Sequence, residues 1–258
     1  MNLTNSPIAD SDRKSNSSPA KTYVFVHGGF HGGWCWKDVT ARLRTLDHIV
    51  YRPTLTGMGE RSHLMSFKPT LETWIEDVAN VIRFEDLDDV ILVGHSFAGS
   101  VVSSLADRMP ERLRHLVYLD AQILRSGQSL ADVLPPEFIE RYEQRAMETS
   151  NGLSIPPNGP EYFGITDPKM AAWMQTKLTP HPLQTYFDKL MLEKPLGNGV
   201  PATYIACSQP LFVGTAKARE LAKGMPDWTY LEIPTAHDAM LLMPAELTRM
   251  LAAIAPRK

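Results

Sequence analysis

One serine stands in a sequence pattern that suits nucleophilic catalysis. Ser96 lies in the stretch Gly94-His95-Ser96-Phe97-Ala98, which has a small residue two positions before the serine and another two positions after it. Such small residues permit a tight turn between a strand and a helix, and this turn presents the serine hydroxyl above a sheet. A serine hydroxyl is a poor nucleophile without a base that removes its proton. The pattern therefore predicts a partner base elsewhere in the chain.

His237 is the histidine whose position best fits this base. It follows the last apolar run of the chain and precedes the last helix-like segment, so it comes after the serine. In folds that have this tight serine turn, the serine comes first in the chain and the histidine comes last. His95 is instead expected to be a packed or hydrogen-bonded residue of the turn. We therefore predict that His237 takes the proton from Ser96.

The acid that would orient His237 is less obvious. The loop at 207–212, after the second-to-last apolar run, contains no carboxylate. Asp120 ends an earlier apolar run, and from the same edge of a sheet it could reach the imidazole and fix its tautomer. We therefore predict Asp120 as the acid. The alternatives are Asp238, or a serine and histidine that act without an acid.

A glycine-rich turn at 27–33 (HGGFHGG) follows the first apolar run. Glycines let backbone amides approach a substrate closely, and acyl transfer needs N–H donors aimed at the developing oxyanion. We expect one donor to be the N–H of Phe97. We expect the other to be the N–H of Gly29, with the N–H of Phe30 as the alternative to Gly29. The spacing G-G-x-x-G-G differs from the dinucleotide-binding G-x-G-x-x-G, so the turn does not predict a nucleotide site.

Short apolar runs alternate with amphipathic segments along the chain. Such continuous apolar runs indicate strands buried on both faces, and their alternation with helices predicts an α/β fold, a mostly parallel, doubly wound sheet with helices on both faces. Ligands in these sheets bind beyond the carboxyl ends of the strands, which is where Ser96, Asp120 and His237 are placed. The expected strands are 23–26, 48–52, 90–93, 116–119, 203–206 and 229–233, and the expected helices include 36–46, 71–82, 215–223, 244–255 and one ending at Met109.

Residues 122–200 interrupt this alternation. They contain no convincing buried strand, but they hold helix-like pieces at 136–149, 168–178 and 182–192. A loop of this length without structure is uncommon in a compact domain. We therefore expect a helical cap, inserted after the strand that ends at Asp120, in a single domain covering 22–258. Residues 1–21 are rich in Ser, Asn, Asp and Pro, and are expected to be a disordered tail.

Charge and cysteine content exclude several functional classes. The 258 residues include 26 Lys and Arg and 29 Asp and Glu, without a basic block that would suit nucleic acid or a membrane surface. No apolar run is long enough to cross a bilayer or to form a signal peptide, so we expect a cytoplasmic protein that binds no membrane. Cys35 and Cys207 stand apart from each other and from other ligand residues, which indicates neither a disulfide framework nor a zinc site.

These motifs resemble those of the α/β-hydrolase superfamily from about residue 23 to the end of the chain. The stretch 27–36, the serine turn and His237 are similar to the branch with plant methylesterases, hydroxynitrile lyases and small bacterial carboxylesterases, including pyrethroid-hydrolysing ones. The stretch 53–63 resembles the bacterial members. This resemblance implies ester hydrolysis through an acyl-serine without a metal or organic cofactor, and a possible homodimer. Plant members have their acid in the loop that is 208–212 here, whereas some bacterial members use the position of Asp120.

We therefore expect a serine hydrolase that cleaves carboxylic esters of small, largely apolar substrates. Aromatic side chains of the cap and the turns would bind such a substrate, although each of them could equally pack the cap onto the core. The candidates are Phe30, Phe97, Phe138, Trp173, Tyr186 and Phe187.

Three other functions were weighed against this one. An amidase or hydrolase of a small carboxylate-bearing substrate would use Arg61 to bind the carboxylate, but Arg61 could equally form a surface pair with Glu60. A ligand receptor built on a hydrolase scaffold would keep the same residues. A hydroxynitrile lyase is not expected, because Asp238 follows His237 where the rubber-tree type of lyase has a lysine that binds cyanide.

Overall fold

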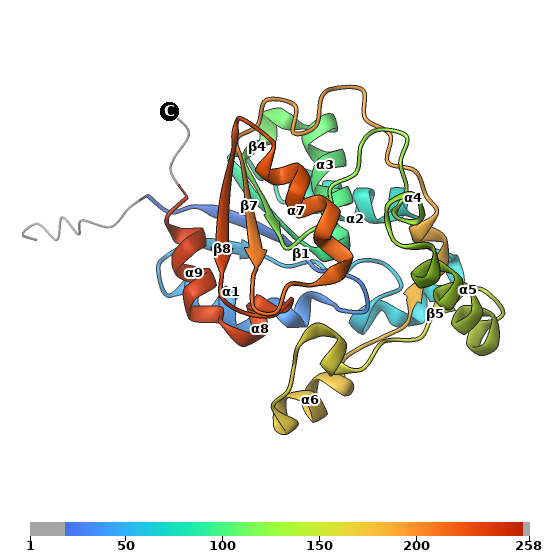
Figure 1. The fold of residues 1–258 in the computed structure, drawn as a ribbon. Coiled ribbons are helices and arrows are strands. Elements are labelled where there is room, and N and C mark those ends of the chain that lie inside the picture. The colour runs from blue at the N-terminus through green and yellow to red at the C-terminus, as the bar shows by residue number, and fades with distance from the viewer. Residues whose placement is uncertain (1–18, 255–258) are drawn as a thin grey trace, which may run out of the picture.

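The computed structural model describes residues 19–254, which form a parallel β-sheet between two layers of helices (Figure 1). All neighbouring strands of this six-stranded sheet pair in parallel, in the order β2-β1-β3-β4-β7-β8. The expected α/β fold with a parallel sheet is therefore confirmed. Its strands are β1 (Thr22–Val26), β2 (Ile49–Tyr51), β3 (Val90–His95), β4 (Leu113–Leu119), β7 (Ala202–Cys207) and β8 (Trp228–Ile233).

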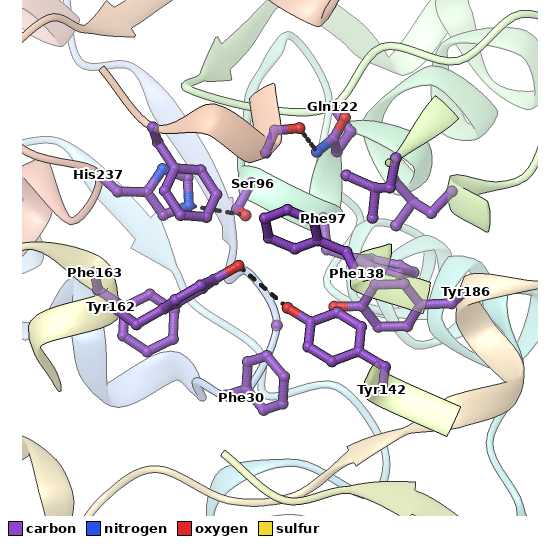
Figure 2. A pocket seen from close by; sticks show the side chains of 15 residues that line it. Phe30, Ser96, Phe97, Gln122, Phe138, Tyr142, Tyr162, Phe163, Tyr186 and His237 are labelled. Atoms are coloured by element: carbon purple, nitrogen blue, oxygen red, sulfur yellow. Dashed lines mark hydrogen bonds between the residues drawn. The ribbon is translucent and has the colours of Figure 1, made fainter. Parts of the chain in front are cut away.

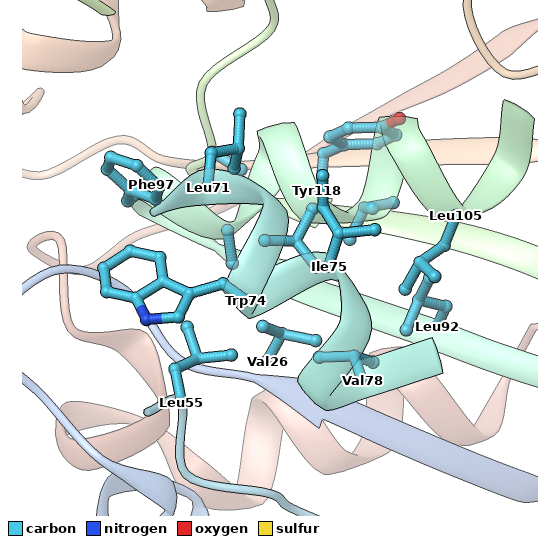
Figure 3. Packing of buried hydrophobic residues seen from close by; sticks show 14 of the residues in the cluster. Val26, Leu55, Leu71, Trp74, Ile75, Val78, Leu92, Phe97, Leu105 and Tyr118 are labelled. Atoms are coloured by element: carbon cyan, nitrogen blue, oxygen red, sulfur yellow. The ribbon is translucent and has the colours of Figure 1, made fainter. Parts of the chain in front are cut away.

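The central strands are buried on both faces, as their continuous apolar runs require. Every residue of β3 and of β7 is buried. Successive side chains point to opposite faces of a strand, and on β3 Leu92 enters one hydrophobic cluster whereas Ile91 and Val93 enter the other. Figure 3 shows the first cluster, in which Trp74 and Ile75 pack towards Val26 and Leu92.

Helices cover the two faces of the sheet with amphipathic surfaces. On one face lie α2 (Leu71–Phe84), α3 (Gly99–Arg108) and α7 (Ala216–Lys223), and on the other lie α1 (Lys37–Arg44), α8 (Ala239–Leu242) and α9 (Pro244–Ala252). Helix α2 begins at a capping box, in which Thr70 accepts from the N–H of Thr73 and Thr73 reaches back to the N–H of Thr70. Short 3-10 helices occupy Gly33–Trp36, Gly59–Phe67, Ser96–Ala98, Pro110–Arg112, Pro160–Phe163, Leu183–Tyr186 and Val213–Thr215.

The segment between β4 and β7, called the cap segment (122–200) below, has structure of its own. It contains α4 (Leu130–Val133), α5 (Pro136–Ser150), α6 (Pro168–Gln175) and an antiparallel pair of very short strands, β5 (Ser154–Ile155) and β6 (His181–Pro182). Its elements α5, β5 and α6 lie together beyond one end of the sheet (Figure 1).

Two expectations for the cap segment are wrong. No strand was expected there, yet β5 and β6 pair. The helix expected at 182–192 is reduced to the 3-10 helix Leu183–Tyr186. The chain beyond this turn bonds to neighbouring segments instead, since the Asp188 carboxylate accepts from the N–H of Leu71, and Leu190 exchanges backbone hydrogen bonds with Gly127 and Gln128.

The tail expected at 1–21 lies mostly outside the described residues. Within them, Lys21 is buried, and its Nζ donates to the carbonyl oxygens of Ala252 and Ile254, each at 2.6 Å. The last residue of the expected tail is therefore held against the segment that follows α9. No helix within residues 19–254 combines the length and hydropathy that crossing a membrane requires. The cytoplasmic location and the homodimer stay predictions.

Candidate active site

Ser96 stands at the tight turn between β3 and α3. Its φ is +54°, a left-handed conformation that is uncommon for a residue with a side chain and that occurs where the surrounding structure enforces it. The turn leaves no room for larger neighbours, because a Cβ added at Gly94 would lie 2.5 Å from Cγ2 of Val102 and 2.9 Å from the carbonyl oxygen of Ala98. A residue without a side chain is thus required by packing at position 94, and the turn leaves the Ser96 hydroxyl facing a cavity.

Three side chains from distant parts of the chain meet at this turn. Nε2 of His237 lies 2.9 Å from Oγ of Ser96, and Nδ1 of His237 lies 2.6 Å from Oδ2 of Asp120. An ionised carboxylate only accepts hydrogen bonds, so Nδ1 carries the ring hydrogen and Nε2 presents its lone pair to the serine hydroxyl. This is the arrangement that a general base needs in order to take the serine proton.

Asp120 is held by the elements on either side of it. Its N–H donates to the carbonyl oxygen of Ile205 on β7, at 2.7 Å. Its second carboxylate oxygen, Oδ1, accepts from the Thr215 hydroxyl at 3.1 Å and lies 3.5 Å from Nη1 of Arg219. Arg219 also donates to Thr215, at 2.6 Å. Asp120 is fully buried, so these partners replace the water that its charge would otherwise bind.

Asp238, the alternative acid, points elsewhere. Its Oδ2 lies 2.9 Å from Nε2 of His31, and no hydrogen bond joins it to the imidazole of His237 within the described part of the chain. His95, as expected, is a buried residue of the turn, and its Nε2 donates to the backbone carbonyl of His237 at 3.0 Å. Burial places the pKa of His95 well below its usual range, so this ring is neutral.

The loop at 207–212, which contains no carboxylate, contacts His237 through an aromatic ring. The ring of Phe212 stacks on the imidazole of His237, with centroids 3.9 Å apart and planes 21° from parallel. Arg219 donates to the carbonyl oxygen of Phe212 at 2.8 Å, which ties the same loop to the surroundings of Asp120. Sequence reasoning missed Phe212, because nothing local signals a stacking partner so far from His237 in the chain.

The backbone beside Ser96 offers unpaired N–H groups. Within residues 19–254, no protein atom accepts from the N–H of Gly29 or of Phe30. Gly29 and Phe97 both line the cavity at Ser96, and Phe30 has a φ of +67° that bends the chain away from β1. A tetrahedral intermediate on Ser96 would need such free donors for its oxyanion.

The cavity in front of Ser96 is small, about 40 Å³, and its walls are mainly aromatic. Figure 2 shows the rings of Phe30, Tyr142, Tyr162 and Tyr186 around the space beside Ser96. The hydroxyls of Tyr142 and Tyr162 lie 3.1 Å apart. The lining residues are Gly29, Phe30, Ser96, Phe97, Gln122, Leu130, Leu134, Phe138, Tyr142, Tyr162, Phe163, Tyr186, Phe212, Gly214 and His237.

Comparison with known proteins places this fold and site in a family. Residues 23–250 match the model of the family described as alpha/beta hydrolase. The chain belongs to the α/β-hydrolase family. The membership expected from the motifs is therefore confirmed, and with it the fold that the sheet and the serine turn display.

Named relatives of this α/β hydrolase include esterases. It is 40% identical over 248 residues to the carbendazim hydrolyzing esterase of Nocardioides sp. (strain SG-4G). The matched region covers 90% of this chain and 98% of the relative. It is 26% identical to methylesterase 7 of Arabidopsis thaliana, over 92% of this chain and 97% of the relative. A solved structure of an extracellular α/β-hydrolase from a Paenibacillus species superposes with a TM-score of 0.79 at 25% identity, over 92% of this chain and 100% of that one.

The hydrolase brings four of the six expected substrate-binding residues to its cavity, namely Phe30, Phe97, Phe138 and Tyr186. It does not bring Trp173 or Phe187 there. On α6 it is Met174 that is buried, which leaves Trp173 42% exposed with its ring edge against Trp34. Phe187 follows Tyr186 directly and faces a separate surface hollow beside Leu183.

The cavity also has walls that the sequence did not indicate. Tyr162, Gln122 and Phe212 line it, and the Gln122 amide donates to the carbonyl oxygen of Gly214 at 2.7 Å. Tyr162 lies in a 3-10 helix of four residues, too short for any periodicity to show which side chain faces inward.

Arg61 forms no ion pair with Glu60 within the described residues. It pairs with Asp77 at 3.3 Å and donates to the carbonyl oxygen of Thr54 and the hydroxyl of Thr56. It does not line the cavity, and its partners hold it within the 53–63 stretch. The carboxylate-binding role considered for Arg61 therefore has no support in the contacts.

The two cysteines are buried and free. Burial raises the pKa of each thiol well above its usual range, so neither is a reactive thiolate. Within residues 19–254, no three His, Cys, Asp or Glu side chains gather in a way that would hold a metal ion.

Proposed function

We propose that this protein hydrolyses small, largely apolar carboxylic esters through an acyl-serine intermediate on Ser96. The observation that carries the proposal is the hydrogen-bonded series from Ser96 through His237 to Asp120, opening on an aromatic cavity. The relatives named as esterases support the same reaction.

The first half of the reaction forms the acyl-enzyme. Oγ of Ser96 attacks the ester carbonyl carbon while Nε2 of His237 takes the hydroxyl proton. The N–H groups of Gly29 and Phe97 bind the negative oxygen of the tetrahedral intermediate. The bond to the alcohol oxygen then breaks, and His237 returns the proton to the leaving alkoxide.

The second half repeats these steps with water. His237 takes a proton from a water molecule, whose oxygen attacks the acyl carbon, and Ser96 leaves with that proton restored to its hydroxyl. Asp120 stabilises the imidazolium that forms in both halves and keeps Nε2 directed at Ser96. Thr215 and Arg219 hold Asp120 for this role.

The cavity walls favour a neutral, flat substrate. None of the lining residues is Lys, Arg, Asp or Glu, so the cavity offers no Lys or Arg side chain that would pair with a substrate carboxylate. Aromatic rings favour stacked or edge-on contact with another ring. We therefore propose aryl esters and aryl carbamates as the preferred class, and carbendazim, the compound for which the Nocardioides relative is named, is one test substrate.

The test is hydrolysis of a substrate panel by wild type and by Ser96→Ala. The panel holds p-nitrophenyl acetate, methyl benzoate, carbendazim and an amide with a free carboxylate. We expect turnover of the neutral esters or the carbamate, none with Ser96→Ala, and labelling of wild type alone by a fluorophosphonate. Activity confined to the anionic amide would contradict the proposal, and binding with only trace turnover of every ester would favour a receptor.

A further inference from the structure

Two buried histidines bind the backbone of the oxyanion loop (27–33), and the mechanism above leaves them without a role. Nδ1 of His27 lies 2.8 Å from the carbonyl oxygen of Gly28, and Nδ1 of His31 lies 2.7 Å from the carbonyl oxygen of Gly29. Both rings have no solvent exposure. A carbonyl oxygen only accepts, so both Nδ1 atoms carry a hydrogen and donate it. Each of two successive peptide groups in the loop is thus held by an imidazole.

The second nitrogen of each ring shows that the two histidines differ in charge. Nε2 of His27 accepts from the N–H of Leu55 at 3.0 Å, so His27 is neutral, and burial lowers its pKa to about 4. Nε2 of His31 faces Oδ2 of Asp238 at 2.9 Å. Since a carboxylate also only accepts, His31 carries hydrogens on both nitrogens and is an imidazolium.

The surroundings favour this charged form of His31. Burial lowers its pKa, but the negative charge of Asp238 and the hydrogen bonds to Asp238 and Gly29 outweigh burial, and the pKa of His31 is raised. The indole of Trp34 stacks on the imidazole with centroids 5.2 Å apart and planes 20° from parallel. An aromatic face attracts a cation placed over it.

Within residues 19–254, the carboxylate of Asp238 has one hydrogen-bond partner, His31. Its other oxygen, Oδ1, has no hydrogen-bond partner among the described residues. Nε2 of His95 is 3.8 Å from Oδ1 and donates instead to the carbonyl oxygen of His237. Both side chains of the His31–Asp238 pair are fully buried, and a buried charge without its partner is strongly unfavourable.

We propose that His31 and Asp238 are positioning residues of the oxyanion hole: the His31 imidazolium holds the carbonyl oxygen of Gly29 and so fixes the orientation of the Gly29 backbone, and Asp238 joins that loop to the loop of His237. The proposal rests on the proposed acyl transfer at Ser96. The N–H of Gly29 belongs to the preceding peptide group, whose oxygen is bound by His27, so the two histidines hold the peptide groups on both sides of Gly29 and with them the direction of its N–H. A charge-assisted hydrogen bond holds its acceptor more firmly than a neutral one. Because Asp238 follows His237 directly, the pair also fixes the oxyanion donors relative to the base.

The variant Asp238→Asn separates charge from hydrogen bonding. The introduced amide can donate to Nε2 of a neutral His31, whose Nδ1 still donates to Gly29. We expect kcat for p-nitrophenyl acetate to fall about tenfold, a fraction of what loss of a whole oxyanion donor costs, with KM within about twofold of wild type. The Ki of an aryl trifluoromethyl ketone, which forms a tetrahedral oxyanion adduct on the serine, should rise by the same factor as kcat/KM falls.

Two further variants complete this set. His31→Ala combined with Asp238→Asn also removes the hydrogen bond to Gly29, and a further loss of about tenfold in kcat is expected. His115→Ala is the matched control, since His115 contacts Thr203 on the sheet at 2.9 Å and touches neither loop. Rates are expressed per site labelled by fluorophosphonate, so unfolded protein does not lower them.

The outcomes distinguish this proposal from the function on which it rests. If Asp238→Asn keeps kcat, KM and Ki within about twofold of wild type, the pair is only structural and the esterase function stands. If wild type neither hydrolyses esters nor reacts with fluorophosphonate, the function itself fails. Should Asp238→Asn not fold, ¹⁵N NMR of the wild-type histidines decides: protonated signals for both ring nitrogens of His31 at pH 7 support the proposal, and a neutral ring overturns it.

Discussion

Oδ2 of Asp120 lies 2.6 Å from Nδ1 of His237, although 117 positions separate the two residues in the chain. The sheet order explains this, because Asp120 follows β4 and His237 follows β8, with only β7 between these strands. The carboxyl ends of β4, β7 and β8 lie at one edge of the sheet. The carboxylate of Asp120 and the imidazole of His237 are therefore long enough to meet in front of the end of β7. The proposed acid therefore comes from the strand next to that of Ser96.

Asp120→Asn should lower kcat for neutral esters by about 10⁴, because an amide can donate to Nδ1 and so favour the wrong imidazole tautomer. The fold should survive, since the amide is isosteric and can keep a contact with Thr215. Steady-state kinetics and a thermal melt check both statements. Activity within about threefold of wild type would show that the acid lies elsewhere.

Phe212→Leu should lower kcat by up to about tenfold. The ring of Phe212 stacks on His237, and an aromatic pair contributes about 0.5–1.5 kcal/mol beyond the area it buries. Without the stacking ring, the imidazole of His237 can rotate away from the orientation in which it bonds to both Asp120 and Ser96. Leu211→Ala is the control, since Leu211 is 55% exposed and should change kcat by less than twofold. Equal effects of both substitutions would mean that loop disturbance, and not stacking, is measured.

Tyr186→Ala should enlarge the cavity and change which acyl groups it accepts. Tyr186 is buried and lines the cavity, so its removal should raise kcat/KM for hexanoyl relative to acetyl p-nitrophenyl esters by about tenfold, roughly the effect of burying two methylene groups. Trp173→Ala is the matched aromatic control outside the cavity. A similar shift in acyl preference with Trp173→Ala would show that the size of the cavity at Ser96 does not set this preference.

The free energy of unfolding should fall as the pH is lowered from about 6.5 to 5. Burial lowers the pKa of His27 to about 4 and that of His181 to about 3, so both stay neutral in the folded chain while the unfolded chain binds protons below about 6.5. The loss is about 2 kcal/mol at pH 5 for each such histidine. Urea unfolding at pH 7 and pH 5 measures it. His31 contributes the opposite sign, because its folded pKa is raised and its stabilisation fades as the pH rises through that value.

The positions of the candidate catalytic residues could be predicted from the sequence because strand ends impose them. Ser96 and His237 each follow an apolar strand, and the parallel sheet brings those ends to one edge. The inward or outward direction of the cap side chains could not be predicted. Tyr186 and Phe187 are neighbours in the chain, yet Tyr186 lines the cavity and Phe187 does not. Their directions are set by the short 3-10 helix Leu183–Tyr186, which is too short to give a periodic pattern in the sequence.

Ser96 and His237 meet across 141 positions of sequence. During synthesis from the amino terminus, the nucleophile, the acid and the whole cap segment are therefore made before the base exists. A nascent or truncated chain that ends before β8 carries a serine with no group to take its proton. Hydrolysis by the proposed mechanism thus requires synthesis to have passed His237, so a product that ends before this residue is inactive by that route whatever part of it has folded.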